Sequence, residues 1–184
     1  MAERVFIIID GSNFYHRVKE AMDKSNVLLD LDYGLFARWL CGERTISAKK
    51  YYIGAVRAKP DDQKGQLLRR NQQKLFTRLM AAEWGIERGY ILNSGGVRHE
   101  KGVDVHMAVD LLVGAYENLY DAAILVSSDT DLIPALKKVR SMGKRIEYVG
   151  FSHKPSYGLI AHSDIRRLLT KEDLQQFLPC QKII

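Results

Sequence analysis

The chain has 184 residues, of which 46% are hydrophobic, a normal size and composition for a domain with a buried core. No apolar stretch is long enough to cross a bilayer, and the early charges at Glu3 and Arg4 argue against a secretory signal. Cys41 and Cys180 lack any short Cys/His spacing, which disfavours a disulfide framework and a zinc site. We therefore expect a cytoplasmic protein with reduced thiols and no membrane partner.

The elements predicted from the sequence alternate between strand and helix. In chain order we expect a strand over 5–9, helices over 13–24 and 32–41, a strand over 51–58, a helix over 61–84, a strand over 86–92, a polar loop over 93–101, a helix over 102–119, a strand over 122–126, a helix over 131–142, a strand over 145–151, an irregular segment over 152–163 and a helix over 171–178. This alternation predicts an α/β fold, a three-layer α/β/α sandwich around a parallel sheet of about five strands.

Neither internal repeats nor long linkers interrupt this pattern. We therefore expect one domain over 1–184, with a core over about 4–169 and a C-terminal helical tail over 170–184. The net charge of +6 favours a polyanionic partner. Basic residues dominate between positions 49 and 78, although composition alone is also typical of a solvated helix face.

A polar motif, Asp10-Gly11-Ser12-Asn13, follows the first predicted strand. One interpretation is structural, with Asp10 or Ser12 capping a helix and Gly11 forming a tight turn. A metal site of the von Willebrand A type would need a second serine where Phe14 stands, and a haloacid dehalogenase phosphatase would need an aspartate in place of Ser12. The functional interpretation that remains makes Asp10 a metal ligand and Asn13 an amide that orients a ligand or a bound water.

A second acidic motif, Ser-Ser-Asp-Thr-Asp at 127–131, follows the predicted strand over 122–126. Asp131 could belong to a helix-capping box, and Asp-x-Asp also occurs in sugar transferases, so the motif alone is ambiguous. In parallel sheets, ligands bind beyond the carboxyl ends of the strands where the strand order reverses. If the strands before Asp10 and Asp129 are neighbours there, the two carboxylates converge.

A third motif, Lys-Gly-Val-Asp at 101–104, opens a predicted amphipathic helix. Asp104 falls in its first turn, near the same edge of the sheet. Asp110 lies about 240° further around the helix, so we expect a structural role for it. Lys101 precedes the aspartate and is a candidate phosphate contact.

Carboxylates from three distant segments repel one another unless a cation or a proton neutralises them. Ligands that are all oxygen suit a hard divalent ion such as Mg²⁺ or Mn²⁺. The sequence therefore predicts a metal-dependent site that acts on phosphate.

These three motifs, in this order and spacing, resemble those of the NYN domain family, and in particular its LabA-like branch, which is related to the PIN-domain nucleases. The likeness runs from about Val5 to Leu169, with Ser128 where relatives more often have glycine. It implies a PIN-like fold and ribonuclease activity. Because PIN relatives often form dimers, it also makes a homodimer possible. Residue by residue, it implies metal ligands and a supporting amide at Asp10, Asp104, Asp129, Asp131 and Asn13.

The leading hypothesis is a ribonuclease that hydrolyses RNA phosphodiester bonds with Mg²⁺ or Mn²⁺. The residues expected to contact the RNA backbone are basic: Lys101, Arg98, Arg57, Lys59, Arg69 and Arg70. One alternative is a non-catalytic RNA-binding regulatory module with a PIN-like fold. Another is a metal-dependent phosphatase or transferase on small phosphorylated substrates, although a glycine-rich nucleotide loop is missing. The sequence leaves open the RNA target, DNA against RNA, endonuclease against exonuclease action and the number of ions.

Overall fold

The computed structural model describes residues 2–23, 27–56, 58–94 and 97–179, without the side chains of 91–100. Its strands are β1 (Arg4–Asp10), β2 (Thr45–Gly54), β3 (Gly85–Ser94), β4 (Val97–Lys101), β5 (Ala122–Val126), β6 (Arg145–Phe151) and β7 (Ile165–Leu169). In the described ranges they form one sheet in the order β4-β3-β2-β1-β5-β6-β7. Neighbouring strands are parallel except for the antiparallel pair β3–β4. The described sheet thus has six parallel strands rather than about five.

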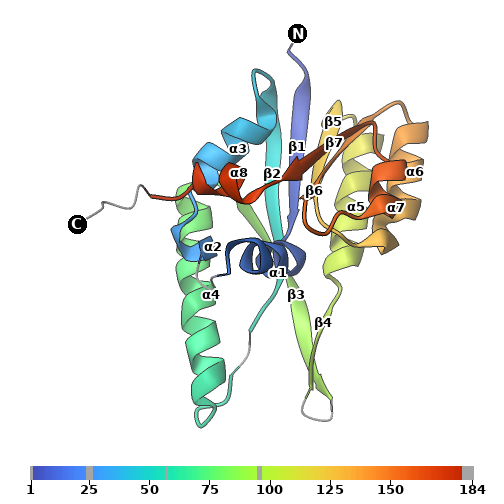
Figure 1. The fold of residues 1–184 in the computed structure, drawn as a ribbon. Helices are drawn as coiled ribbons and strands as arrows, with labels where there is room; N and C mark the ends of the chain where they lie inside the picture. Colours follow the sequence, from blue (N-terminus) through green and yellow to red (C-terminus); the bar gives the residue numbers. More distant parts are fainter. Residues whose placement is uncertain (1, 24–26, 57, 95–96, 180–184) are drawn as a thin grey trace.

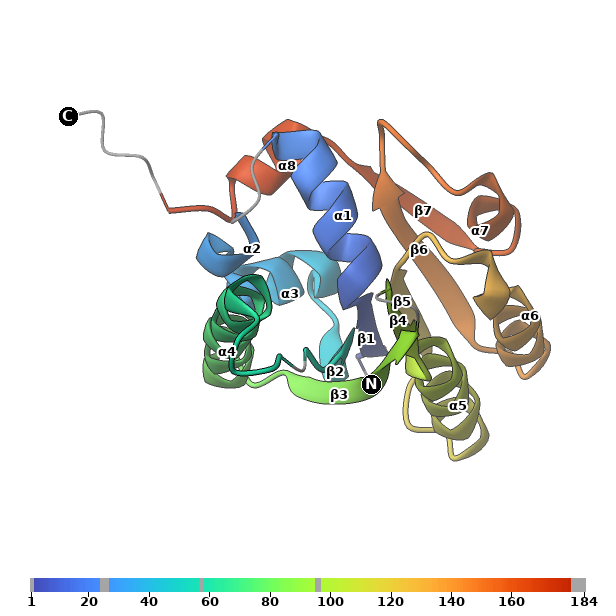
Figure 2. The same ribbon diagram turned by 90° about the horizontal axis from the view of Figure 1, so that it is seen from below.

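Helices cover both faces of this sheet, which confirms the predicted three-layer α/β/α architecture. They are α1 (Gly11–Met22), α2 (Val27–Asp30), α3 (Tyr33–Cys41), α4 (Gln63–Ala81), α5 (Val103–Tyr116), α6 (Ile133–Ser141), α7 (Tyr157–Ala161), α8 (Lys171–Gln175) and the 3-10 turn η1 (Thr130–Leu132). Helices α1 to α4 and α8 lie on one face, and α5, α6 and α7 on the other (Figures 1 and 2). None of the helices in the described part of the chain combines the length and hydrophobicity that a membrane span requires.

The apolar run of β1 is explained by burial on both sides. Val5, Ile7 and Ile9 pack under the helices of one face, while Phe6 and Ile8 pack under those of the other. A strand at the centre of a parallel sheet has no solvated face, so it is uniformly apolar rather than alternating. The last residue of this central strand therefore lies at the carboxyl edge of the sheet.

The strand order reverses between β1 and β5. From β1 the chain proceeds outward through β2 and β3, and from β5 it proceeds outward in the opposite direction through β6 and β7. Ile9 of β1 lies beside Val126 of β5, so the two strands reach the carboxyl edge together. The predicted neighbourhood of these two strands is confirmed. The first part of α4 and the β3–β4 hairpin both extend past this edge (Figure 1).

Three segments differ from the prediction. The predicted polar loop over 93–101 contains the end of β3 and all of β4, because a hairpin pairs backbone groups whatever its side chains are. Strand β7 was not predicted, since two of its five residues are arginines, a pattern that an edge strand tolerates. Helix α7 also lies within the segment expected to be irregular.

Candidate functional site

Asp10 lies where β1 ends and α1 begins, and its side chain is 2% exposed. One carboxylate oxygen accepts the backbone N–H of Asn13 at 3.0 Å, which caps the helix. The other accepts the Asn13 amide at 2.5 Å and the Ser127 hydroxyl at 2.9 Å. The capping interpretation of Asp10 is therefore correct, and the same carboxylate is also tied to the neighbouring strand's loop.

Gly11 allows this helix start to lie against β2. A Cβ atom at this position would lie 2.4 Å from Cε1 of Tyr51 and 2.7 Å from the backbone oxygen of Tyr52. Any larger residue would push α1 away from the sheet. The glycine of the motif thus serves close packing, and this packing holds Asp10 at the edge.

Ser127 connects Asp10 with Asp129. Its side chain is 5% exposed, donates its hydroxyl to Asp10 and accepts the backbone N–H of Asp129 at 3.0 Å. Asp129 in turn accepts the backbone N–H of Asp131 at 2.9 Å and so caps η1. The two aspartates that follow β1 and β5 are therefore joined through one buried hydroxyl.

Asn13 and Ser128 form a second link between the same two segments. The hydroxyl of Ser128 donates to the side-chain carbonyl of Asn13, whose amide donates to Asp10. Arg17 lies one turn after Asn13 on α1 and approaches Ser128 with Nη2 at 3.4 Å, while Nη1 pairs with Glu20 at 2.9 Å. Arg17 was missed from the sequence, although its spacing of four residues from Asn13 places both on one face of α1.

Asp104 and Asp131 are exposed at the same side of the sheet. Asp104 lies in the first turn of α5, a helix that packs beside η1. In the described residues, no group of three or more His, Cys, Asp or Glu side chains is placed to hold one metal ion. The carboxylate of Asp10 accepts the α1 cap and the Ser127 hydroxyl, and the carboxylate of Asp129 caps η1, while Asp104 and Asp131 are exposed.

The donor atoms at the joined pair are nevertheless of one chemical kind. They are the carboxylates of Asp10 and Asp129, the hydroxyls of Ser127 and Ser128, and the carbonyl of Asn13. Such an all-oxygen set fits Mg²⁺ or Mn²⁺ and does not fit a thiolate-seeking metal. The residues therefore fit such an ion in the chemistry of their ligand atoms.

The predicted basic contacts are in part described. Lys59, Lys101, Arg69 and Arg70 are exposed, and none of them forms an ion pair with a described residue. Lys101 ends β4 directly before α5, and the two arginines lie on α4. Two further predicted contacts, Arg57 and the side chain of Arg98, lie outside the described residues.

Asp110 has the structural role expected for it. It accepts the hydroxyl of Tyr52 at 2.6 Å and the ammonium of Lys50 at 2.8 Å. Burial raises the pKa of Tyr52, and the hydrogen bond to Asp110 raises this pKa further. Asp110 therefore connects α5 to β2 through these two contacts.

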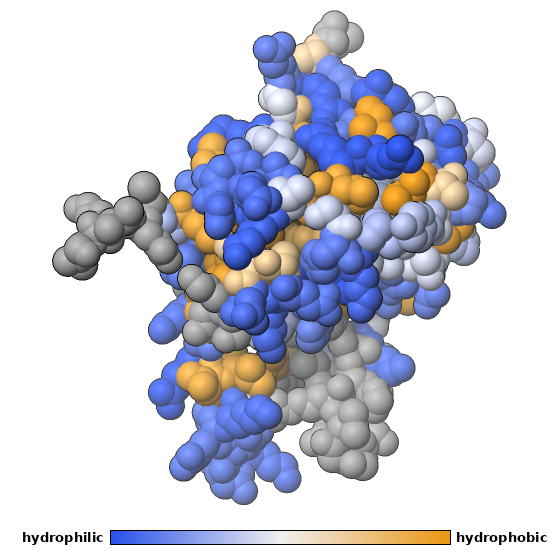
Figure 3. Space-filling model, in the orientation of Figure 1, coloured by the Kyte–Doolittle hydropathy of each residue, from blue (hydrophilic) through white to orange (hydrophobic). Residues whose placement is uncertain are grey.

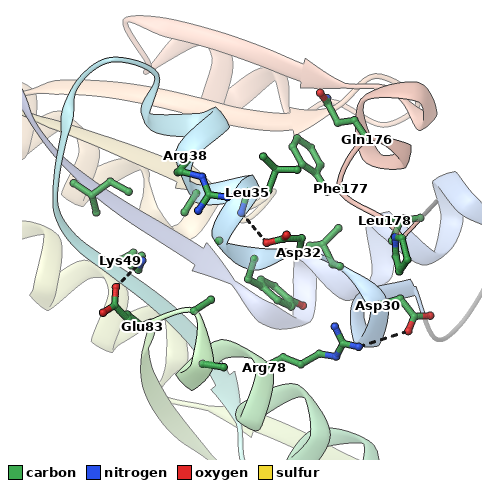
Figure 4. A pocket seen from close by; sticks show the side chains of 18 residues that line it. Asp30, Asp32, Leu35, Arg38, Lys49, Arg78, Glu83, Gln176, Phe177 and Leu178 are labelled. Atoms are coloured by element: carbon green, nitrogen blue, oxygen red, sulfur yellow. Dashed lines mark hydrogen bonds and ion pairs between the residues drawn. The ribbon is translucent and has the colours of Figure 1, made fainter.

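A pocket of about 770 Å³ lies between α3, the end of α4 and the residues after α8 (Figure 4). Four of its charged side chains face one another in two pairs, Arg78 with Asp30 at 3.9 Å and Lys49 with Glu83 at 4.0 Å. None of the predicted site residues lines this pocket. It is separate from the carboxyl edge and its aspartates.

Comparison with known proteins gives both a structural neighbour and a family. A protein of unknown function from Vibrio parahaemolyticus has a similar fold, with a TM-score of 0.72 and 22% identity over 97% of both chains. A C-S lyase from Staphylococcus hominis, whose structure contains bound PLP, is too distant to inform the fold: its TM-score is 0.32 and its identity 8%, over 84% of this chain and 41% of the lyase. No curated protein matches the sequence. The NYN domain model matches residues 4–167, which contain the whole site, and the chain therefore belongs to the NYN domain family.

Proposed function

We propose that this NYN domain is a metal-dependent ribonuclease whose reaction centre is built around Asp10 and Asp129. The observation that supports this most is the buried Ser127 hydroxyl, which joins the two aspartates at the point where the strand order reverses. NYN domains are related to the PIN-like nucleases, so a phosphodiester substrate agrees with the family as well as with the site.

In this proposal Asp10 and Asp129 hold a divalent ion, and the exposed Asp104 and Asp131 supply further carboxylates at the entrance. Mg²⁺ or Mn²⁺ at such a site supplies a hydroxide nucleophile at neutral pH and neutralises charge on phosphate oxygens. Asn13 and Ser127 fix the orientation of Asp10, because each donates a hydrogen bond to the same carboxylate oxygen. Together these contacts present the aspartates in one defined arrangement.

RNA is the proposed substrate because the chain carries a net charge of +6 and has exposed basic residues on α4 and at the end of β4. Arg17 approaches Ser128 of this centre, Arg69 and Arg70 on α4 pair with no described acid, and Lys101 ends β4 at the base of the β3–β4 hairpin. Contacts of this kind bind the phosphate backbone and carry little sequence information. Binding should therefore weaken as salt is raised.

The decisive experiment combines Asp10→Asn with Asp129→Asn. Asparagine keeps a side-chain oxygen for capping but removes the negative charge that a cation requires. We expect this double variant to lose cleavage of labelled single-stranded RNA in Mn²⁺, while its RNA affinity stays equal or rises. Wild-type protein should lose cleavage when a chelator is added.

Asp32→Asn is the matched control, because Asp32 caps α3 by accepting the N–H of Leu35 at 2.8 Å and lies outside the site. It should cut RNA as fast as the wild type. Cleavage retained by the double variant would refute the assignment. Wild-type protein that binds RNA in Mn²⁺ without cutting it would be a binding module, and one that cuts a phosphomonoester but not RNA would be a phosphatase.

A further inference from the structure

A second, smaller cavity begins directly beside the aspartate site. It has a volume of about 190 Å³ and lies between α1, α2, α4 and the carboxyl end of β2. Gly11, the residue after Asp10, forms part of its wall, so the cavity and the acidic centre share the first turn of α1. Whatever occupies the cavity is held next to the place where we propose that the phosphodiester bond is cut.

The walls of this cavity are aromatic and aliphatic. Tyr15, Tyr51, Ile53 and Leu75 contribute to them, together with leucines of α2. Apolar walls that include tyrosine rings suit the faces of a planar ring, as in the pockets that hold unstacked bases. The lining therefore favours an aromatic ligand over a charged one.

Two amides of α4 give the cavity its polar character. The buried Gln72 is engaged at both ends of its amide, since it donates to the carbonyl of Gly54 at 2.8 Å and accepts the N–H of Val56 at 2.9 Å. Its neighbour Asn71 is half-buried, lines the same cavity and makes no side-chain hydrogen bond to the described residues. Asn71 can therefore both donate to and accept from the edge of a ligand.

We infer that this cavity binds one nucleobase of the RNA substrate, adjacent to the phosphate that is cut. The inference rests on the proposed ribonuclease function and names a base-binding subsite for it. A base needs apolar contact for its faces and hydrogen bonds for its edge, and the cavity offers both. A purely aliphatic ligand would leave the amide of Asn71 without a partner, at a cost in binding.

The surroundings of the cavity match the chain that would carry such a base. Arg69 and Arg70 precede Asn71 on α4, are exposed and pair with no described acid. Leu67 and Leu68 are 57% and 41% exposed, and Figure 3 shows a hydrophobic patch among hydrophilic residues over this part of α4. Cations for the phosphates thus lie beside an apolar entrance for the base.

The test compares RNA octamers that carry one abasic position, placed in turn along the strand. Binding is measured by fluorescence anisotropy on the Asp10→Asn/Asp129→Asn protein, which should hold the RNA uncut. Removal of one particular base should weaken binding about tenfold, whereas removal of the others should change it little. In wild-type protein with Mn²⁺, the cut should fall beside that same position.

Variants of the cavity, made in the same double variant, assign the effect to it. Val56→Trp should fill the space and reduce binding of intact RNA to the abasic level, and Asn71→Ala should weaken it about fivefold. Neither change should alter binding of the octamer that lacks the critical base. Gln73→Ala is the matched control, because it removes an exposed amide of α4 that does not line the cavity. Asn71→Ala keeps the test decisive if the tryptophan variant fails to fold.

Two results would overturn the inference. In one, every abasic octamer binds as tightly as intact RNA. In the other, the cavity variants weaken abasic and intact RNA equally, which would indicate a backbone contact. Failure of the proposed reaction looks different: base-dependent binding would persist while wild-type protein with Mn²⁺ leaves the RNA whole.

Discussion

Ser127 has a single hydroxyl proton, and the structure directs it to Asp10. The oxygen then accepts the backbone N–H of Asp129, so one small side chain fixes two residues from different strands. Because the serine is 5% exposed, water cannot easily replace either partner. At this scale the site depends on a residue that carries no charge of its own.

Ser127→Ala should lower RNA cleavage about 10- to 100-fold, the usual effect of removing a group that orients a ligand. It should also cost about 1–3 kcal/mol of stability, because two buried polar groups lose their partner. Single-turnover cleavage and urea unfolding measure the two effects. Ser47→Ala is the control: its hydroxyl donates to the backbone oxygen of Val5 at 3.1 Å on the same sheet, away from the site. Equal cleavage by both variants would contradict the role of Ser127.

At the scale of elements, the site depends on how closely α1 approaches β2. The first turn of α1 lies over Tyr51 and Tyr52, and Asp10 is both the end of β1 and the cap of this helix. A shift of the helix would move the capping carboxylate and Asn13 together. The spacing between helix and sheet is therefore part of the site.

Gly11→Ala should destabilise the protein by about 1–3 kcal/mol, because its methyl group would meet a backbone oxygen that cannot rotate away. The control is Gly34→Ala, early in α3, where the nearest atoms are side-chain ends of Asp32 and Arg38 at 3.3 and 3.4 Å. That change should be neutral or stabilise by up to about 1 kcal/mol, as alanine favours helices. Thermal unfolding compares the two. A Gly11→Ala protein as stable as the wild type would show that α1 is free to move.

The sequence predicts elements well where periodicity and burial agree, as in β1 and β5, whose apolar runs place Asp10 and Asp129 at one edge. The sequence does not predict a strand that forms through backbone pairing in a hairpin, such as the polar strand β4. In the site, local motifs identify the aspartates. The roles of Ser127 and Arg17 cannot be predicted in this way, because they depend on contacts between α1 and the loop after β5. A cavity formed by three helices and a strand leaves no local sequence signal.

On the scale of the whole molecule, the opposite end of the sheet is held by a buried carboxylate. Glu147 of β6 is 1% exposed and is shared by Arg44, which precedes β2, and Arg167 of β7. Arg167 approaches at 2.8 Å, and Arg44 makes two contacts with the same carboxylate. One acid thus ties three separate segments at the amino end, while the carboxyl end carries the aspartates.

Glu147→Ala should destabilise the fold by about 3 kcal/mol, because it leaves two arginines without the acid they share. Burial would raise the pKa of Glu147, but the hydrogen bonds from Arg44 and Arg167 outweigh it and lower this pKa below the ordinary value of 4.5. A lowered folded-state pKa stabilises the protein above the unfolded-state pKa, and this contribution is lost as the pH falls through the folded-state pKa. The stability gap between wild type and variant should therefore be full at pH 7 and shrink below about pH 4.5, as measured by urea unfolding.

Glu87→Ala is the matched comparison, since Glu87 is 37% exposed and pairs with Lys50 at 2.9 Å near the surface. Water screens that pair, so its loss should cost less than about 1 kcal/mol. Both variants should cut RNA at the wild-type rate at temperatures where they remain folded, because no hydrogen bond or ion pair in the described structure joins either residue to Asp10 or Asp129. The free energy of unfolding is compared between wild type and Glu147→Ala from pH 7 to pH 3. A constant difference over this range would mean that the stabilisation comes from packing and not from the charge of Glu147.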